Sequence, residues 1–407
     1  MKQGLRENWK QFAILILVNA FVGAMIGMER SVFPDLAKEK FGMQGHTALL
    51  SFIITFGLIK SIANYAAGRY TKLIGRKKML MLGWVAALPV PFLLIFANSW
   101  NMILLANIFL GLNQGLTWST TVLMKIDLVG EKNRGLAMGL NEFAGYLTVS
   151  LIALLSSWIA VEYGVHPYPF YMGIGFAFAG LLITHFWVND TTAMAKLEAG
   201  GDSKSEKKNI FLYTTWQHRN LGAVTQTGFV NNLNDAMAWG IIPVWMHQQN
   251  YTLGEIGLVA AVYPAMWGIG QLFSGKLSDV FCKKDILLYG MIFQAMAIFL
   301  FPFMQSLQAL IILSAILGIG TALVYPTFLS SIAENTTVEE RPESLGIFRF
   351  WRDFGYVAGG LMVGLTADRV SVVFSIELVA FITLISGIII AFRMYCPTTK
   401  SFTCFQG

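Results

Sequence analysis

Charged residues are scarce in this chain of 407 residues. They make up 13% of the sequence, whereas 55% of the residues are hydrophobic. So few polar residues cannot cover the surface of a water-soluble globule, and a soluble protein is therefore excluded. The apolar runs approach the ~20 residues that cross a bilayer, and they contain glycine and proline rather than alternating polar residues. They therefore predict membrane-spanning helices and not a barrel.

Cysteine is rare as well. Cys282, Cys396 and Cys404 fall in expected loops and in the tail, without CxxC spacing. This spacing predicts neither a disulfide framework nor a metal cluster, and we interpret all three as residues without a structural or chemical role. No metal and no cofactor are expected.

Motifs of enzymes and of ATP-driven pumps are also missing. The sequence has no GxxxxGKS or GxxxxGKT, no HExxH and no GxSxG, so we expect no enzymatic activity. The net charge of +6 is spread over many loops rather than gathered in one arm, which argues against a nucleic-acid partner. No cleavable signal peptide is evident, because the apolar run at 11–28 is too long for one.

Twelve apolar runs are present, each with ends uncertain by ~3 residues. They lie at 11–34, 46–67, 79–98, 101–125, 135–160, 168–188, 217–246, 254–274, 286–305, 307–332, 343–366 and 371–393. An even number of spans puts both termini on one side. Most basic loop residues gather on that side, and Lys38, Lys40 and Arg369 fall on the other, so the positive-inside rule predicts cytoplasmic termini.

The segment 189–216 interrupts the apolar pattern with small, charged and glycine residues. We interpret it as a solvated cytoplasmic linker between two halves, and a short amphipathic helix on the membrane surface is the alternative. The expected division is a first half at 1–188, this linker, a second half at 217–395 and a cytoplasmic tail at 396–407.

A basic turn occurs twice in the chain. Residues 68–80 read GRYTKLIGRKKML and residues 275–287 read GKLSDVFCKKDIL. Subtracting 68 from 275 gives an offset of 207, about half of the chain, which indicates two copies of one unit. An ordinary pair of basic cytoplasmic loops is the simpler alternative.

The repeated turn resembles the signature loop of the major facilitator superfamily, G-x-L-x-D-x-x-G-R-K/R-x-x-L, between the second and third helices of each half. The matching residues are Gly68, Gly75, Arg76 and Lys77 in the first copy and Gly275, Leu277 and Asp279 in the second. Lys72 stands where the first copy should have Asp, so the gating role that the family gives this Asp is carried over to Asp279 alone. The resemblance implies an all-α integral membrane protein of about twelve helices in two pseudo-symmetric six-helix halves.

The eleventh run carries the sharpest polar cluster. Arg349, Arg352, Asp353 and Tyr356 stand at i, i+3, i+4 and i+7, hence on one helix face. Two guanidinium groups can hold a carboxylate or phosphate, with Asp353 balancing their charge. The alternative is a structural charge pair near the cytoplasmic helix end.

Lys60 lies in the middle of the second run and requires a carboxylate partner inside a membrane. Asp353 is one candidate, because helices 2 and 11 meet across the halves in the fold that the resemblance implies. Glu142 on the fifth helix is the other. A purely structural ion pair that holds the halves together is the alternative to a substrate-binding role.

Two acids occupy similar places in the first and seventh runs. Glu29 is followed by Arg30, and Asp235 lies 206 positions after Glu29. A desolvated acid can bind a proton, so both are candidates for proton coupling, together with Glu142. Asp235 is the better carrier, because Arg30 would keep Glu29 ionised; a structural ion pair is the alternative for Glu29. Residues expected on the face of Asp235 are Thr225, Gly228, Asn232 and Trp239.

The fourth run shows a polar stripe at spacings of three and four. It consists of Asn107, Gly111, Gln114, Trp118, Thr121 and Lys125. We expect this stripe to face a watery cavity, with Gln114 and Trp118 contacting substrate, and Thr321 and Tyr325 of the tenth run to face it from the second half.

Two features weaken an assignment to the drug antiporters of the superfamily. The fifth run lacks the Gly-Pro element of that group, and Asn107 occupies the place of its arginine. We therefore expect a monomeric, proton-coupled secondary transporter of the cytoplasmic (inner) membrane that moves a small polar or anionic organic solute by alternating access. A multidrug efflux proton antiporter is the alternative, and a non-transporting membrane sensor on the same fold is a second alternative.

Overall fold

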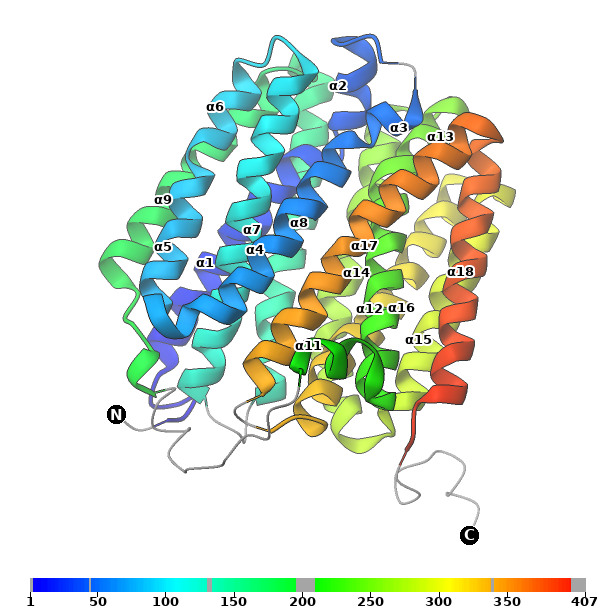
Figure 1. Ribbon diagram of the computed structural model, residues 1–407. Helices are drawn as coiled ribbons and strands as arrows, with labels where there is room; N and C mark the ends of the chain where they lie inside the picture. The colour runs from blue at the N-terminus through cyan, green and yellow to red at the C-terminus, as the bar shows by residue number, and fades with distance from the viewer. Residues whose placement is uncertain (1–2, 44, 130–133, 195–208, 338–339, 397–407) are drawn as a thin grey trace.

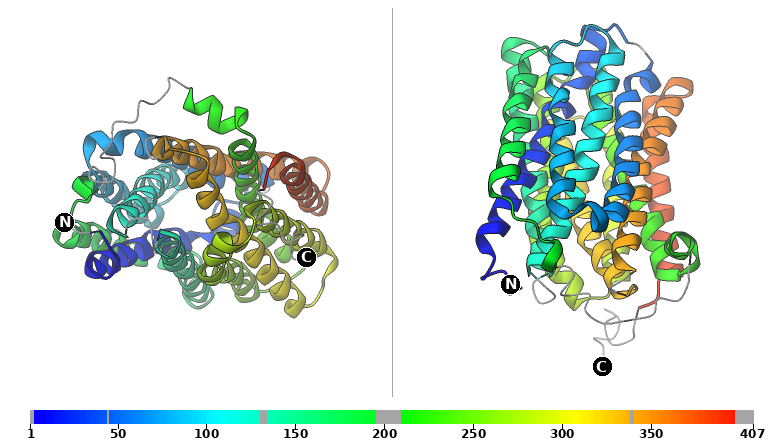
Figure 2. Two further views of the ribbon diagram at one scale, coloured as in Figure 1. Left: turned by 90° about the horizontal axis from the view of Figure 1, so that it is seen from below. Right: turned by 60° about the vertical axis from the view of Figure 1, so that its left-hand side comes forward.

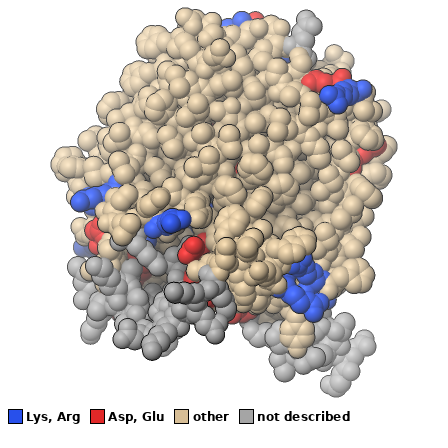
Figure 3. All heavy atoms as spheres, in the orientation of Figure 1, with Lys and Arg blue, Asp and Glu red and all other residues tan. Residues whose placement is uncertain are grey.

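The computed structural model describes residues 3–43, 45–129, 134–194, 209–337 and 340–396. In this part of the chain, long helices run side by side between two ends of the molecule (Figure 1). Helix α1 begins and α18 ends at the same end, as an even number of crossings requires. Most charged side chains on the face in Figure 3 lie toward the two ends, and a broad uncharged band separates them.

The first half contains six long helical stretches and three short helices. The long ones are α1 (Trp9–Arg30), α4 (Ser51–Ile74), α5 (Arg76–Ala87) with α6 (Pro89–Ile95), α7 (Trp100–Val129), α8 (Arg134–Tyr163) and α9 (Tyr171–Trp187). The short ones are α2 (Phe33–Glu39), α3 (His46–Leu49) and η1 (Tyr168–Phe170). Pro89, at the first position of α6, divides the third stretch. A proline has no backbone N–H, so it cannot donate the hydrogen bond to the preceding turn that would continue α5.

The second half repeats this order. Its long stretches are α12 (Arg219–Ala236) with η3 (Met237–Ile241) and α13 (Ile242–Gln248), α14 (Leu253–Val280), α15 (Lys283–Leu300), α16 (Leu307–Glu334), α17 (Arg341–Arg369) and α18 (Val372–Arg393). Short helices are α11 (Ile210–Leu212), η2 (Tyr213–Gln217) and η4 (Phe301–Phe303). The all-α fold of about twelve membrane helices is confirmed. Most helix ends lie within a few residues of the expected ones, but α4 and α14 end at 74 and 280 instead of 67 and 274, so both helices continue into the repeated turn.

Apolarity is unevenly distributed among these helices. In the described residues, 8 helical stretches are long and apolar enough to cross a membrane on length and composition alone. The remaining long helices are α4, α7, α12 and α17. They carry Lys60, Gln114, Asp235 and the Arg349–Tyr356 cluster, so several polar side chains of the buried centre lie on helices that do not meet this criterion.

The internal repeat reappears in matched ion pairs. Arg76 at the start of α5 pairs with Asp127 near the end of α7, at 3.1 Å between Nε and Oδ2. Lys283 at the start of α15 pairs with Glu334 at the end of α16. Subtracting 76 from 283, or 127 from 334, gives 207 in both cases, which is the offset of the repeated turn.

Glycine contacts repeat with the same offset. A Cβ on Gly111 of α7 would lie 2.9 Å from the carbonyl oxygen of Phe56 in α4. A Cβ on Gly318 of α16 would lie 2.5 Å from the carbonyl oxygen of Tyr263 in α14. The missing side chains let each pair of helices approach backbone to backbone, which is a frequent way of packing helices in membranes.

The two halves meet along α4 with α17 and along α8 with α14. Figure 2 (left) shows the blue-to-green helices of the first half beside the green-to-red helices of the second, with orange α17 reaching along the blue helices. Gly57 lies against Tyr356, and the Ser150 hydroxyl donates to the carbonyl of Ala261 at 2.7 Å. At the end opposite the termini, Asp368 of α17 accepts hydrogen bonds from the backbone N–H groups of His46 and Thr47.

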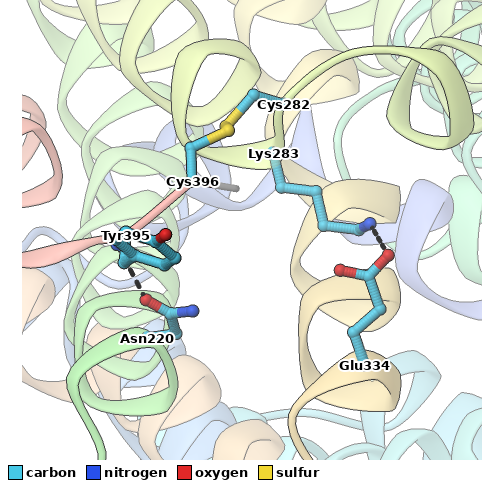
Figure 4. Close-up of a disulfide and its surroundings, with 6 residues drawn as sticks. All are labelled: Asn220, Cys282, Lys283, Glu334, Tyr395 and Cys396. Carbon is cyan, nitrogen blue, oxygen red and sulfur yellow. Dashed lines mark hydrogen bonds and ion pairs between the residues drawn. A yellow bond between two sulfur atoms is a disulfide. The ribbon is translucent and has the colours of Figure 1, made fainter. Parts of the chain in front are cut away.

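One expectation about the cysteines is wrong. Cys282 and Cys396 form a disulfide that joins the α14–α15 turn to the segment after α18 (Figure 4). The two residues are 114 positions apart, and the fold brings them together because α15 and α18 pack side by side, with Cys282 just before α15 and Cys396 just after α18 at the same end. Cys404 lies outside the described residues, as do 195–208 of the expected linker and 397–407 of the expected tail.

Candidate functional site

Asp353 of α17 is the centre of a buried polar cluster between the halves. Its Oδ1 accepts hydrogen bonds from Arg352 Nε at 2.9 Å, from Arg352 Nη2 at 2.7 Å and from Asn232 Nδ2 at 2.8 Å. Its Oδ2 accepts one from Asn64 Nδ2 and lies 3.9 Å from Lys60 Nζ. The structure therefore pairs Lys60 with Asp353 and not with Glu142, and both oxygens of Asp353 are occupied.

The two arginines of α17 have donors to spare. Arg349 donates from Nη1 to the Ser119 hydroxyl of α7 at 2.7 Å, while its Nε and Nη2 have no partner among the described residues. Arg352 Nη1 has none either, and its guanidinium lies 4.9 Å from the ring centre of Tyr325. Each arginine is only 5% exposed, so neither is a solvated helix-end residue. Unpaired buried N–H groups are costly, and an anion would satisfy these.

Asp235 of α12 lies between two tyrosines. Its Oδ1 accepts a hydrogen bond from the Tyr263 hydroxyl of α14, and its Oδ2 accepts one from the Tyr356 hydroxyl of α17 at 3.1 Å. Tyr356 stacks on Trp239, with the ring centres 6.1 Å apart and the planes at 14°. The carboxylate is fully buried, so its contact with solvent depends on how α12, α14 and α17 separate.

Glu142 of α8 belongs to a second network. Its Oε1 accepts hydrogen bonds from Trp118 Nε1 at 3.0 Å and from Asn141 Nδ2 at 2.8 Å. Its Oε2 has no partner among the described residues, and Lys125 Nζ donates to Asn141 Oδ1. Glu142 thus keeps one acceptor oxygen free, whereas Asp235 and Asp353 use both.

The Glu29 and Arg30 pair forms the last two residues of α1 and is buried inside the protein. The Arg30 Nη1 is 4.0 Å from Glu29 Oε1, and both side chains are fully buried. The Arg30 guanidinium stands 4.7 Å from the ring centre of Phe56 and 4.8 Å from that of Trp239 in the second half. The pair therefore contributes a cation–π contact across the halves.

The expectation that the polar stripe of α7 faces one watery cavity is wrong. Gly111 faces α4, and Gln114 donates from Nε2 to the carbonyl of Val22 in α1 at 2.8 Å. Trp118 turns toward Glu142 of α8. The stripe is wide enough to contact three neighbouring helices, so its residues serve different partners. On α12, Thr225 does not contact the surroundings of Asp235 as expected; its hydroxyl donates a hydrogen bond to the carbonyl of Thr214.

The signature loop is well defined in its first copy. Gly75 adopts φ +95°, a conformation that favours glycine, and separates α4 from α5. Arg76 bonds to Asp127, and Lys77 donates from its backbone N–H to Asp190 at 3.0 Å and from Nζ to the carbonyl of His185. These contacts attach the turn to α7, to the last turn of α9 and to the segment that follows α9.

The second copy continues α14 through Gly275 and Asp279 to Val280. Gly68 of the first copy lies beside Gly346 of α17. The side chains of Lys72 and Asp279 are outside the described part of the structure. The gating role expected of Asp279 therefore stays a prediction.

Sequence reasoning missed two partners in the centre. Asn64 bonds to Asp353 and accepts a hydrogen bond from Ser119, and it stands four residues after Lys60 on the same helix face. Tyr263 bonds to Asp235 and precedes Pro264, as Tyr325 precedes Pro326. The helical spacing and the repeated Tyr-Pro dipeptide were the signals that could have identified them.

Two pseudo-symmetric halves with a buried charged centre define a membrane transporter. The family model of the Major Facilitator Superfamily matches residues 14–221 and 224–402. The chain belongs to this superfamily, so the recognition made from the repeated turn is confirmed.

Relatives of known name are distant. The "Multidrug resistance protein MdtG" of Salmonella choleraesuis (strain SC-B67) is 24% identical over 370 residues, which cover 87% of this chain and 88% of the relative. The protein of the same name from Salmonella newport (strain SL254) has the same identity and coverage. The solved structure of the human organic anion transporter MFSD10 (TETRAN) is similar with a TM-score of 0.73 at 13% identity, over 94% of this chain and 99% of that one. At that identity, the structure supports the fold alone.

Proposed function

We propose that this protein is a secondary active transporter that moves a small organic solute with an anionic group, coupled to protons, by alternating access. The observation that carries the proposal is the imbalance of hydrogen-bond donors over acceptors around Asp353. Both oxygens of Asp353 are occupied, whereas Arg352 Nη1 and the Arg349 Nε and Nη2 have no partner among the described residues. A ligand with acceptor oxygens satisfies these donors, and a cation does not.

Proton binding is assigned to Asp235 or Glu142. Both are buried between helices that belong to different halves or contact the other half, so a change in helix packing changes their access to water. The oxygens of Asp235 accept hydrogen bonds from Tyr263 and Tyr356, while Oε2 of Glu142 has no partner among the described residues. Glu29 remains a weaker candidate, because Arg30 neighbours it.

The setting follows from charge and apolarity. We assign the protein to the cytoplasmic (inner) membrane with both termini in the cytoplasm, because the basic loop residues gather at that end. We further propose that it works as a monomer in the lipid bilayer, with the solute and protons as its small-molecule partners and with neither a cofactor nor nucleic acid.

Arg352→Lys tests the anion site. The variant keeps the charge but loses the planar fork, and a lysine cannot reproduce both bonds to Asp353 and a third to substrate. We expect the affinity for the transported anion to fall about thirtyfold or more, because breaking a desolvated charge-assisted contact costs ~2–5 kcal/mol. Candidate anions come from a thermal-shift screen, and calorimetry on purified protein measures binding for the wild type and the variant.

Asp353→Asn is the companion variant. It removes the negative charge that pairs with Arg352 but keeps the Arg352 guanidinium available to bind an anion. It therefore distinguishes a loss of protein stability from a loss of anion affinity. If both variants lose thermal stability equally and each folded molecule binds the anion as the wild type does, the anion proposal is wrong.

Multidrug efflux by proton exchange is the second candidate. The relatives named above are called multidrug resistance proteins, and the centre is rich in aromatic rings, among them Tyr146 and Trp267, whose centres are 3.5 Å apart. Such rings stack on flat lipophilic cations. Competition by several unrelated lipophilic cations, and none by organic anions, would favour this function over anion transport.

A further inference from the structure

A groove runs along the outside of the second half, between α15 and α18. Its volume is about 610 Å³. The residues that line it are Ile292, Ala295, Met296, Phe299, Phe374, Glu377, Leu378, Ala380, Phe381 and Leu384. No residue of the central site is among them.

The groove faces the bilayer. The α15 residues recur at spacings of three and four, as do Phe374, Glu377 and Phe381 of α18, so each helix contributes one face. Phe381 is 59% exposed and Phe299 is 49% exposed at its rim. Both helices are long and apolar enough to cross a membrane, so these exposed rings meet lipid chains.

One carboxylate interrupts this apolar lining. Glu377 is the one charged residue among those that line the groove, and no hydrogen bond or ion pair joins it to another described residue. It is the sixth residue of α18, ~8 Å from the helix end opposite the termini at 1.5 Å per residue. An acidic side chain at this depth is costly unless a partner reaches it, and the level of lipid headgroups is within its reach.

We propose that this groove binds phosphatidylethanolamine from the leaflet at the end opposite the termini. One acyl chain lies along the phenylalanine and aliphatic side chains, and the primary ammonium bonds to the Glu377 carboxylate. Charge complementarity selects this lipid. A primary ammonium has three N–H donors, the quaternary ammonium of phosphatidylcholine has none, and phosphatidylglycerol places a negative headgroup beside the carboxylate.

Native mass spectrometry of the purified full-length protein tests the proposal. The protein is released from detergent with an equal mixture of phosphatidylethanolamine, phosphatidylcholine and phosphatidylglycerol that share the same acyl chains. We expect the wild type to retain phosphatidylethanolamine over phosphatidylcholine by about fivefold, the range of a partly exposed ion pair. Glu377→Gln should abolish this preference. Glu162→Gln should preserve it, because Glu162 is an exposed acid at the end of α8, on the same side of the molecule as Glu377 but outside the groove.

Phe381→Ala tests the acyl-chain contact separately. It should lower retention of all three lipids, whereas Phe392→Ala should not, because Phe392 is 81% exposed and lies outside the groove. Equal retention of the lipids by the wild type, a preference that survives Glu377→Gln, or a dimer that dissociates in Glu377→Gln would each overturn the proposal.

Discussion

At the scale of single residues, Asp353 is the carboxylate around which the cations of the central site gather. Asp353 holds Arg352, and Lys60 lies close by, while asparagines from α4 and α12 occupy the rest of its oxygens. Buried charges persist in membranes only when they are paired or hydrogen-bonded. An anionic substrate, as proposed above, would bind the N–H donors of Arg349 and Arg352 that Asp353 leaves free, and this contact is a physical basis for coupling substrate binding to the packing of α17.

Asp235→Asn should abolish accumulation of solute driven by a proton gradient but preserve exchange of solute between the two sides. The amide cannot bind and release a proton. Its carbonyl oxygen can accept a hydrogen bond from one of the two tyrosines, and its NH2 group can donate to the hydroxyl oxygen of the other, so Tyr263 and Tyr356 both keep a partner. Uptake and counterflow in proteoliposomes measure the two activities.

Glu142→Gln is the matched comparison. It makes the same chemical change in the other half, where Trp118 and Asn141 bond to the side chain. If Glu142→Gln loses coupling and Asp235→Asn keeps it, the proton carrier is on α8 instead.

At the scale of helices, the repeat places equivalent ion pairs in unequal surroundings. Arg76 and Asp127 are both buried, whereas Glu334, the partner of Lys283, is 56% exposed. Arg76→Ala should therefore lower the free energy of unfolding by ~3 kcal/mol, because it leaves a buried carboxylate with fewer partners. Lys283→Ala should lower it by ~1 kcal/mol or less.

Thermal unfolding in one detergent compares these two variants directly. The pairs occupy pseudo-equivalent places at the same end of the molecule, so each serves as the other's control. Equal losses of stability would mean that burial does not determine the contribution of these pairs.

At the scale of the whole molecule, contacts at the end opposite the termini hold the halves together. Asp368 of α17 accepts hydrogen bonds from His46 Nδ1 at 2.9 Å and from the Thr47 hydroxyl at 2.6 Å, besides the two backbone N–H groups. The alternating access proposed above would require this contact to open and close.

Asp368→Ala should favour opening at that end. Leu50, which is buried beside Gly240 of the other half, reports on it when replaced by cysteine in a chain whose native cysteines are serine. We expect the thiol to react about tenfold faster, which corresponds to a shift of ~1.4 kcal/mol. Glu255→Ala is the control, because Glu255 bonds within its own half to Thr252. If the thiol reacts equally faster in both variants, the faster reaction reflects a general loss of packing and not the opening of the Asp368 contact.

Much of the fold could be predicted from the sequence. Helix hydrogen bonds are local and the bilayer requires long apolar stretches, so the runs alone located α1, α7 and most other long helices within a few residues. The repeated turn at an offset of 207 established two halves, and the Arg76 and Lys283 pairs obey the same offset. The cluster on α17 was also predictable, because four residues at helical spacing must share a face.

The partners of those residues were decided by the tertiary structure. Lys60 had two plausible acids, and the approach of α4 to α17 selected Asp353. The polar stripe of α7 divides among three neighbours, and Cys282 reaches Cys396 only because α15 packs beside α18. Such contacts depend on the rotation and crossing of helices within a few ångströms, and a pattern of hydrophobicity along the chain does not contain that information.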